Sequence, residues 1–129
     1  MDRKLGLLAI ALMSTLLMAC AGSSAASSSG KPTSSTQAVD IKALDTLKFD
    51  PATVTVKSGT PVRLTIVNNG ALEHDWVVDN LDGKKLSVDA KPKTNATADF
   101  TPTKAGSYEF YCSIPGHREA GMKGTLTVQ

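Results

Sequence analysis

The segment from Tyr111 to Met122 constrains the fold of this chain more than any other stretch. It carries Cys112, His117 and Met122 in the spacing C-x4-H-x4-M, between two runs of strand-like sequence. The other histidine of the chain, His74, begins a strand-like run far upstream. If the fold brings His74 to this segment, a thiol, two imidazoles and a thioether meet as one soft ligand set.

Apolar and polar residues alternate in short runs throughout residues 39–129, and turn-forming residues separate the runs. Alternation with a period of two predicts β-strands that bury one face. The inward positions are Val39, Ile41 and Ala43; Val54 and Val56; Val62, Leu64 and Ile66; the run 74–78 with Trp76 as a core residue; Leu86 and Val88; Ala96, Ala98 and Phe100; Tyr108, Phe110 and Cys112; and Leu126 and Val128. Phe49-Asp50-Pro51 reads as a break, and residues 84–92 leave room for one helical turn. Seven or eight short strands predict an all-β fold, an antiparallel β-sandwich or barrel.

Residues 1–19 have the pattern of an export signal. Arg3 and Lys4 precede an apolar core, Leu5 to Leu17, that is too short to span a bilayer. The core runs into Leu17-Met18-Ala19-Cys20, which resembles the lipobox of bacterial lipoproteins. That resemblance implies lipidation of Cys20. The alternative is an ordinary signal peptide followed by a chance cysteine.

Residues 20–38 are rich in Ser and Ala and show no apolar periodicity, so we predict a flexible tether. We expect an exported protein, anchored by its lipid to a bacterial membrane, whose domain of residues 39–129 faces the periplasm or the cell exterior. A lipidated Cys20 cannot form a disulfide, which would leave Cys112 as a lone thiol in an oxidising compartment. Such a thiol is a liability unless a metal holds it.

The charge balance limits the kinds of partner. The export signal holds two of the 14 basic and one of the 12 acidic residues, so the remainder stays close to neutral. Binding to nucleic acid requires a clustered basic face, and the sequence shows none. We therefore expect no nucleic-acid partner, and we expect a monomer.

Each candidate ligand has an ordinary structural explanation when it is taken alone. Cys112 and Met122 could pack as core residues, His74 could be a satisfied buried imidazole, and His117 could be an exposed loop residue. The combination argues for a metal site. Cys112 shares the inward face of its strand with Phe110, and the loop that follows can return His117 and Met122 to it.

The donor set narrows the choice of metal. Structural zinc sites use four Cys or His ligands, and only three exist here. Iron–sulfur clusters need more cysteines. A binuclear copper centre needs a second Cys in this loop, where the chain has Gly116. Two His and one Cys with a weak axial Met form blue copper sites, so we expect one copper ion.

At these residues the chain resembles the cupredoxins, the blue copper family of plastocyanin, azurin and auracyanin. The resemblance covers residues 39–129 and includes Phe49-Asp50-Pro51, Gly59-Thr60-Pro61-Val62, Asn68-Asn69-Gly70, His74 and the segment from Tyr108 to Gly124. The loop spacing is most similar to auracyanin, and the lipobox suits a lipoprotein form. The family implies a Greek-key sandwich with His74, Cys112, His117 and Met122 as copper ligands, His117 being the more exposed histidine.

One residue departs from the family pattern. Better-known members often carry Asn after the first ligand histidine, and this chain has Asp75. Asp75 keeps the backbone N–H that bonds the cysteine sulfur, and its carboxylate could accept the hydroxyl of Ser113. We expect Asp75 and Ser113 to support the ligands. The alternative is a solvated strand residue.

The resemblance implies a one-electron carrier between a redox donor and acceptor, such as a cytochrome or a membrane electron-transport complex. An enzyme is the first alternative, but both histidines are used by one site and none remains for a second centre. A copper chaperone or storage protein is the second alternative. We expect electrons to leave at His117, through a flat uncharged patch around this histidine that includes Ala71, Leu72, Pro115 and Gly121.

Overall fold

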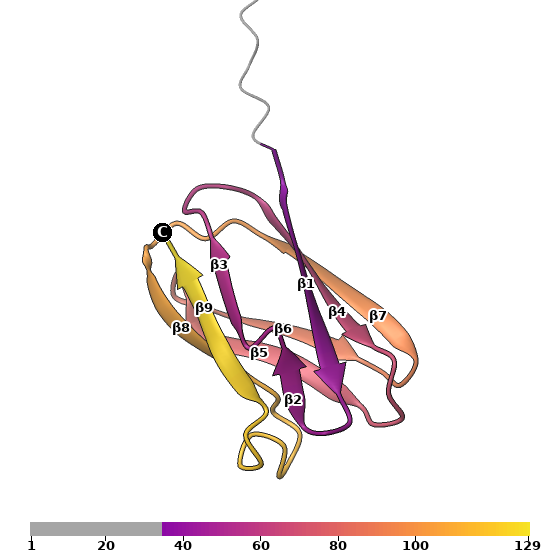
Figure 1. Ribbon diagram of the computed structural model, residues 1–129. Coiled ribbons are helices and arrows are strands. Elements are labelled where there is room, and N and C mark those ends of the chain that lie inside the picture. Colours follow the sequence, from indigo (N-terminus) through magenta and orange to yellow (C-terminus); the bar gives the residue numbers. More distant parts are fainter. Residues whose placement is uncertain (1–34) are drawn as a thin grey trace, which may run out of the picture. The chain divides into compact units, whose positions relative to one another are not determined.

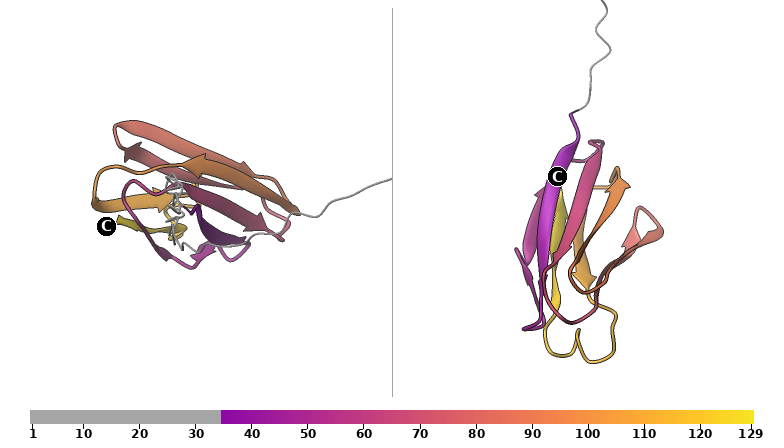
Figure 2. Two further views of the ribbon diagram at one scale, coloured as in Figure 1. Left: turned by 90° about the horizontal axis from the view of Figure 1, so that it is seen from above. Right: turned by 90° about the vertical axis from the view of Figure 1, so that its right-hand side faces the viewer.

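The computed structural model of the protein describes residues 35–129 as nine strands in two packed sheets (Figure 1). The first sheet holds, in spatial order, β2 (Lys48–Asp50), β1 (Gln37–Leu44), β4 (Val62–Asn68) and β7 (Thr94–Phe100); the second holds β3 (Thr53–Val56), β9 (Lys123–Val128), β8 (Gly106–Tyr111), β5 (His74–Leu81) and β6 (Lys84–Ala90). Figure 2 shows the two layers from above and from the side. The predicted signal, Cys20 and nearly all of the predicted tether lie outside the described residues.

The all-β prediction is confirmed, and the described residues contain no helix. The structure has nine strands where seven or eight were predicted, because Phe49 and Asp50 of the predicted break Phe49-Asp50-Pro51 belong to a short strand, β2. Its single inward side chain, Phe49, pairs with Ala43 of β1, and three residues are too few to show an alternation. Residues 84–92 left room for a helical turn in the sequence, but residues 84–90 form the strand β6.

Each sheet contains one parallel pair, whereas the sequence predicted an antiparallel sandwich. β1 runs parallel to β4, with Val39 opposite Leu64, and β3 runs parallel to β9, with Val54 opposite Leu126. Alternation reports which face of a strand is buried and carries no information about the direction of its neighbour. The residues predicted to face inward are therefore correct, whereas the β1–β4 and β3–β9 pairs are parallel instead of antiparallel.

The core lies between the sheets and is centred on three aromatic rings. Phe110 packs edge-on against Phe49 and tilted against Trp76, with ring centroids 5.4 Å apart in both pairs. Each such contact adds roughly 0.5–1.5 kcal/mol beyond the burial of apolar area. Trp76, predicted as a core residue, is almost fully buried. These rings come from β2, β5 and β8, so they join the two sheets.

The loops that carry the candidate ligands gather at one end of the sandwich, which we call the ligand end. They are residues 69–73 before β5 and residues 112–122 between β8 and β9, and the β1–β2 turn at residues 45–47 lies beside them (Figure 1). β1 begins at the opposite end, where Gln37 pairs with Val62. The β5–β6 connection is also there, a two-residue hairpin turn at Asp82 and Gly83, both with positive φ.

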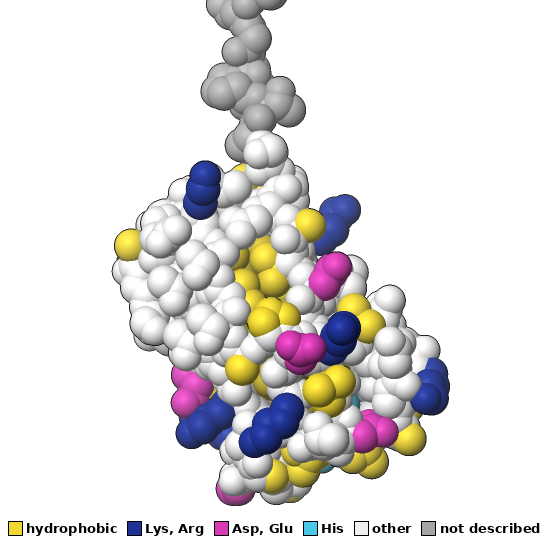
Figure 3. All heavy atoms as spheres, in the orientation of Figure 1, with side chains coloured by type: hydrophobic (Ala, Val, Ile, Leu, Met, Phe, Trp, Pro, Cys, Tyr) yellow, Lys and Arg dark blue, Asp and Glu magenta, His cyan; other side chains and the backbone are white. Residues whose placement is uncertain are grey.

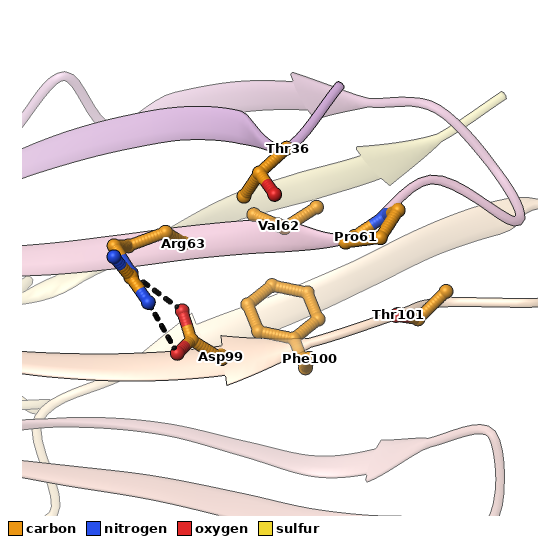
Figure 4. A pocket seen from close by; sticks show the side chains of 7 residues that line it. All are labelled: Thr36, Pro61, Val62, Arg63, Asp99, Phe100 and Thr101. Atoms are coloured by element: carbon orange, nitrogen blue, oxygen red, sulfur yellow. Dashed lines mark hydrogen bonds and ion pairs between the residues drawn. The ribbon is translucent and has the colours of Figure 1, made fainter. Parts of the chain in front are cut away.

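A hollow of about 320 Å³ near the start of β4 contains no metal-binding cluster (Figure 4). Arg63 makes a two-pronged contact with Asp99 on its wall, at 2.8 and 2.9 Å, and Phe100 lies beside this pair. Both charged side chains are largely exposed, so the pair adds little to stability. Residues 35–129 contain no helix with the length and apolar character needed to cross a membrane.

Candidate metal centre

Three candidate ligands meet at the ligand end. The donor atoms of His74, Cys112 and His117 all lie within 4.8 Å of one another. The Cys112 sulfur is 3.4 Å from Nδ1 of His117. His74 and Cys112 are fully buried, and His117 is half-buried. The fold thus joins one histidine from the start of β5 to two ligands from a loop almost forty positions later.

Backbone hydrogen bonds place Met122 beside the other ligands. The Cys112 N–H donates to the Met122 carbonyl at 3.0 Å, and the Met122 N–H donates to the His117 carbonyl at 2.9 Å. The Met122 side chain is fully buried and belongs to the same apolar cluster as Cys112. Gly121, with φ of 96°, supplies the left-handed turn that brings the chain back into β9. All four sequence-predicted ligands are therefore neighbours.

The imidazole of His74 has the character of a metal ligand. It is fully buried, and neither ring nitrogen has a hydrogen-bond partner. An unsatisfied buried polar group costs about 1–3 kcal/mol, so such a group calls for an explanation. Nε2 lies 3.7 Å from Oδ1 of Asp45, which leaves Nδ1 as the nitrogen free for a metal. One bound ion would satisfy it.

Burial sets the protonation of the site. It lowers the pKa of His74, and the neighbouring His117 lowers it further, so the imidazole is neutral and able to bind a metal at pH 7. Burial raises the pKa of the Cys112 thiol. A metal must therefore displace the thiol proton on binding, as is general for cysteine ligands. Two imidazoles and a thiol, with a thioether close by, fit copper among the metals of this ligand chemistry.

Asp75 holds the start of the ligand loop in two ways. Its backbone N–H donates to the Cys112 sulfur at 3.5 Å. Its carboxylate accepts the backbone N–H of Ser113 at 2.5 Å, and its other oxygen accepts the Ser113 hydroxyl. The Asp75 side chain is buried rather than solvated. β5 and the loop after β8 are thereby joined directly at the sulfur.

The surface around His117 is largely apolar, and Figure 3 shows hydrophobic side chains gathered at this end. Ala71, Leu72 and Pro115 are exposed, and Gly121 is half-buried, so the predicted patch residues reach the surface. Leu72 is 43% exposed; Leu44, which the sequence analysis did not include, is 36% exposed. These are the two large hydrophobic side chains that stand out among the described residues.

A hollow of about 540 Å³ lies beside this surface, and both histidines are among the residues that line it. Leu72 and Ile114 form apolar parts of its wall, and the carboxylates of Glu73 and Asp89 lie at its edge. Arg118, nearby in the loop, is already engaged, since its guanidinium stacks 3.8 Å above the Tyr111 ring. The approach to His117 is thus apolar with an acidic margin.

Sequence reasoning missed Asp45. Its carboxylate accepts the backbone N–H groups of Ala71, at 2.8 Å, and Leu72, at 3.1 Å. These two bonds hold the pKa of Asp45 below its usual value. The same carboxylate faces Nε2 of His74. No local pattern marks Asp45, because its partners lie 26 and 27 positions away.

Comparison with known proteins gives consistent results. A family described as "Cupredoxin-like domain" matches residues 9–128. Copper-resistant cuproprotein CopI of Rubrivivax gelatinosus is 38% identical, over 66% of this chain and 62% of its own length. Auracyanin-B of Chloroflexus aurantiacus is 34% identical, over 71% of this chain and 52% of its own length. The chain therefore spans just over half of these relatives.

A solved structure shares the fold. Auracyanin A of Chloroflexus aurantiacus, described as a "blue" copper protein, superposes with a TM-score of 0.65 at 23% identity. The match covers 74% of this chain and all of that one. At this level of identity the likeness concerns the architecture alone.

Proposed function

The chain belongs to the cupredoxin-like family, and on that premise we propose that it is a mononuclear blue copper protein that passes single electrons between redox partners. The observation that carries the proposal is the meeting of His74, Cys112 and His117 donor atoms within 4.8 Å, with only His117 open to the surface. The family binds one copper, and a bound copper would supply one-electron redox chemistry at this site.

The residues around the ligands contribute rigidity. The N–H groups of Cys112 and Met122 are both hydrogen-bonded within the loop, and Asp75 fixes the loop from β5. A ligand set that is already in place needs little rearrangement when the charge of the site changes. The buried Cys112 and Met122 side chains also exclude water, which limits solvent reorganisation.

His117 is the proposed port for electrons, and the apolar surface around it is the proposed docking face. Weak redox encounters bury less than about 1,200 Å² in total. Exposed Leu72 and Pro115 suit such brief contact because they need no strong ion pairs. The proposed partners are a donor and an acceptor protein, such as a cytochrome or a membrane electron-transport complex.

No catalytic role is proposed. The chain has two histidines, and both are neighbours in this one centre. A second metal centre or a histidine base would need further imidazoles. A role in copper resistance is the second candidate, and the name of the CopI relative is the observation that favours it. In that role the protein would bind and hold copper rather than exchange electrons quickly.

Spectroscopy of the copper-loaded protein tests the proposal. An intense blue or green band from the Cys112 thiolate is expected, and Cys112→Ser should lose it while the domain still folds. Fast electron self-exchange would support a carrier. A colourless protein that readily releases its copper to a chelator would instead support a copper-handling role, and an unchanged band in Cys112→Ser would exclude this site.

Membrane attachment is a separate part of the proposal. Leu17-Met18-Ala19-Cys20 supports export and lipidation at Cys20, with the domain facing the periplasm or the cell exterior. Two or more acyl chains anchor stably, at about 0.8 kcal/mol per buried CH₂, whereas one chain anchors marginally. Cys20→Ser should move the protein from membranes to a soluble fraction. A wild-type protein without added lipid mass would contradict this assignment.

A further inference from the structure

We propose that the β1–β2 turn is a charged clamp that holds both ligand loops, with Asp45 on the loop before His74 and Lys48 on the loop before Met122. The proposal rests on the proposed function for its effect on the copper, but not for the contacts that define it. Asp45 lies in the turn and Lys48, three positions later, is the first residue of β2; the two side chains carry opposite charges. Their effects on the centre should therefore be opposite in sign.

The Asp45 arm fixes the loop that leads into β5. Its carboxylate accepts the N–H groups of Ala71 and Leu72, and it lies 3.7 Å from Nε2 of the buried His74. Charge-assisted hydrogen bonds of this kind are stronger than neutral ones. A proton on Nε2 would point towards this carboxylate, which would keep Nδ1 free for the metal.

The Lys48 arm fixes the other loop. Its Nζ lies 3.3 Å from the carbonyl oxygen of Ala120 and 3.5 Å from that of Gly121. Gly121 is followed directly by Met122, whose N–H and carbonyl are bonded to His117 and Cys112. The ammonium group thus sits against the last turn before the axial ligand candidate.

Each arm has a glycine opposite it. A Cβ on Gly70 would overlap the carboxylate of Asp45, and a Cβ on Gly121 would come within 2.5 Å of the Lys48 ammonium. Each ligand loop therefore has a glycine at the position that contacts the charged side chain, Gly70 against Asp45 and Gly121 against Lys48. Gly121 is also favoured by its φ of 96°, whereas Gly70 has no left-handed backbone, so the close approach of Asp45 is the reason for a glycine at position 70.

The turn is closed by a backbone hydrogen bond and flanked by paired strands. The Leu47 N–H donates to the Leu44 carbonyl at 2.9 Å, and Leu47 has a φ of 58°. On either side, β1 and β2 pair from Lys42 opposite Asp50 to Leu44 opposite Lys48. The turn belongs to the first sheet. The loop of residues 69–73 leads from β4 of that sheet into β5 of the second, and the loop of residues 112–122 connects β8 and β9 of the second. The clamp therefore links the sheets at the metal centre.

The charges predict the direction of each effect. The oxidised centre carries one more positive charge than the reduced centre, so a nearby carboxylate stabilises it and a nearby ammonium destabilises it. Asp45→Asn should raise the reduction potential, and Lys48→Gln should lower it. Both side chains are partly or fully exposed, so the shifts should shrink with added salt.

The hairpin offers matched controls. Lys42 of β1 and Asp50 of β2 carry the same pair of charges in the same hairpin, and they form only a loose exposed pair at 4.0 Å. Voltammetry of the copper-loaded full chain at low salt should show at least a threefold change in the oxidised-to-reduced ratio for Asp45→Asn and Lys48→Gln, about 28 mV at 59 mV per tenfold. Lys42→Gln and Asp50→Asn should shift it less. Equal shifts in test and control variants, or shifts of one sign at Asp45 and Lys48, would overturn the clamp.

A second readout does not need copper. In the metal-free chain, Asp45→Asn and Gly70→Ala should each speed amide hydrogen exchange at Ala71 and Leu72 at least tenfold, while Asp50→Asn should not. Gly70→Ala matters because it displaces the carboxylate without removing its charge. Unchanged exchange in both variants would contradict the contacts themselves. If the copper-loaded wild-type chain is not blue, the proposed function is wrong. The hydrogen-exchange test of the clamp is unaffected, because it uses the metal-free chain.

Discussion

The backbone N–H of Asp75 points to the sulfur of Cys112 at a distance of 3.5 Å. The side chain of the same residue accepts both hydrogens that Ser113 offers. One residue of β5 therefore positions both Cys112 and the residue after it, the first through its backbone N–H and the second through its carboxylate.

Asp75→Asn tests what the carboxylate contributes. The amide keeps the backbone N–H to Cys112 and can still accept one bond from Ser113, so copper binding and colour should persist. Loss of a negative charge beside the sulfur destabilises the oxidised centre, and the reduction potential should rise by roughly 59 mV, a tenfold change in the redox ratio. Asp89→Asn is the control, because Asp89 lies directly opposite Asp75 in β6 and is exposed. A fall in potential, or an equal rise in the control, would contradict this account.

Met122→Leu tests the axial position. Leucine has a similar volume, so the buried site should stay packed, at a cost below about 1.5 kcal/mol. Removing the thioether donor destabilises the oxidised form more than the reduced form, and the potential should rise while the blue band remains. Visible spectra and voltammetry of the purified variant decide the matter. Loss of colour would show that Met122 has another role.

Leu72→Lys tests the electron port. A charge on the apolar face beside His117 should slow electron exchange with a redox partner about tenfold and leave the visible spectrum nearly unchanged. Ala105→Lys adds the same charge on the exposed loop between β7 and β8, so it controls for net charge. Stopped-flow rates for both variants separate a local effect from a general one. Equal rates for Leu72→Lys and wild type would place the port elsewhere.

Asp82→Asn tests stability at the far end. The Asp82 carboxylate accepts the N–H groups of Thr103 and Lys104, at 2.6 and 2.9 Å, and these bonds lower its pKa. A lowered pKa means stability that is present above the unfolded value and lost as the pH falls through the folded value. Asparagine tolerates the positive φ here, so the backbone should survive the change. The fall in Tm between pH 6 and pH 3 should be smaller in the variant than in the wild type. An identical fall in both would show that the Asp82 carboxylate does not contribute to the acid sensitivity.

The sequence was informative wherever one residue type carries its own chemistry. Cys112, His117 and His74 could be picked out because thiols and imidazoles are rare in this chain and their spacing fits a loop between strands. The inward residues of β4 and β8 followed from alternation alone. β2 was missed because Phe49 is its only buried position, and one residue shows no period.

Contacts between surface residues that lie far apart in the chain could not be predicted from the sequence. Lys48 and Ala120 are 72 positions apart, and nothing near either residue indicates the other. Asp45 is likewise a common turn residue until the fold places Ala71 against it. The sequence thus predicts which atoms could hold a metal, while the groups that hold those ligands in place emerge only when both sheets are assembled.

The placement of the two ends of the sandwich has a further consequence. β1 begins, and β9 runs into Gln129, at the end opposite the ligand loops (Figure 1). A chain joined at either side of this domain need not cross the face that His117 opens onto. The domain can therefore be attached to a membrane anchor, to a second copy or to a larger protein through either terminus, and the surface around His117 stays accessible to a partner.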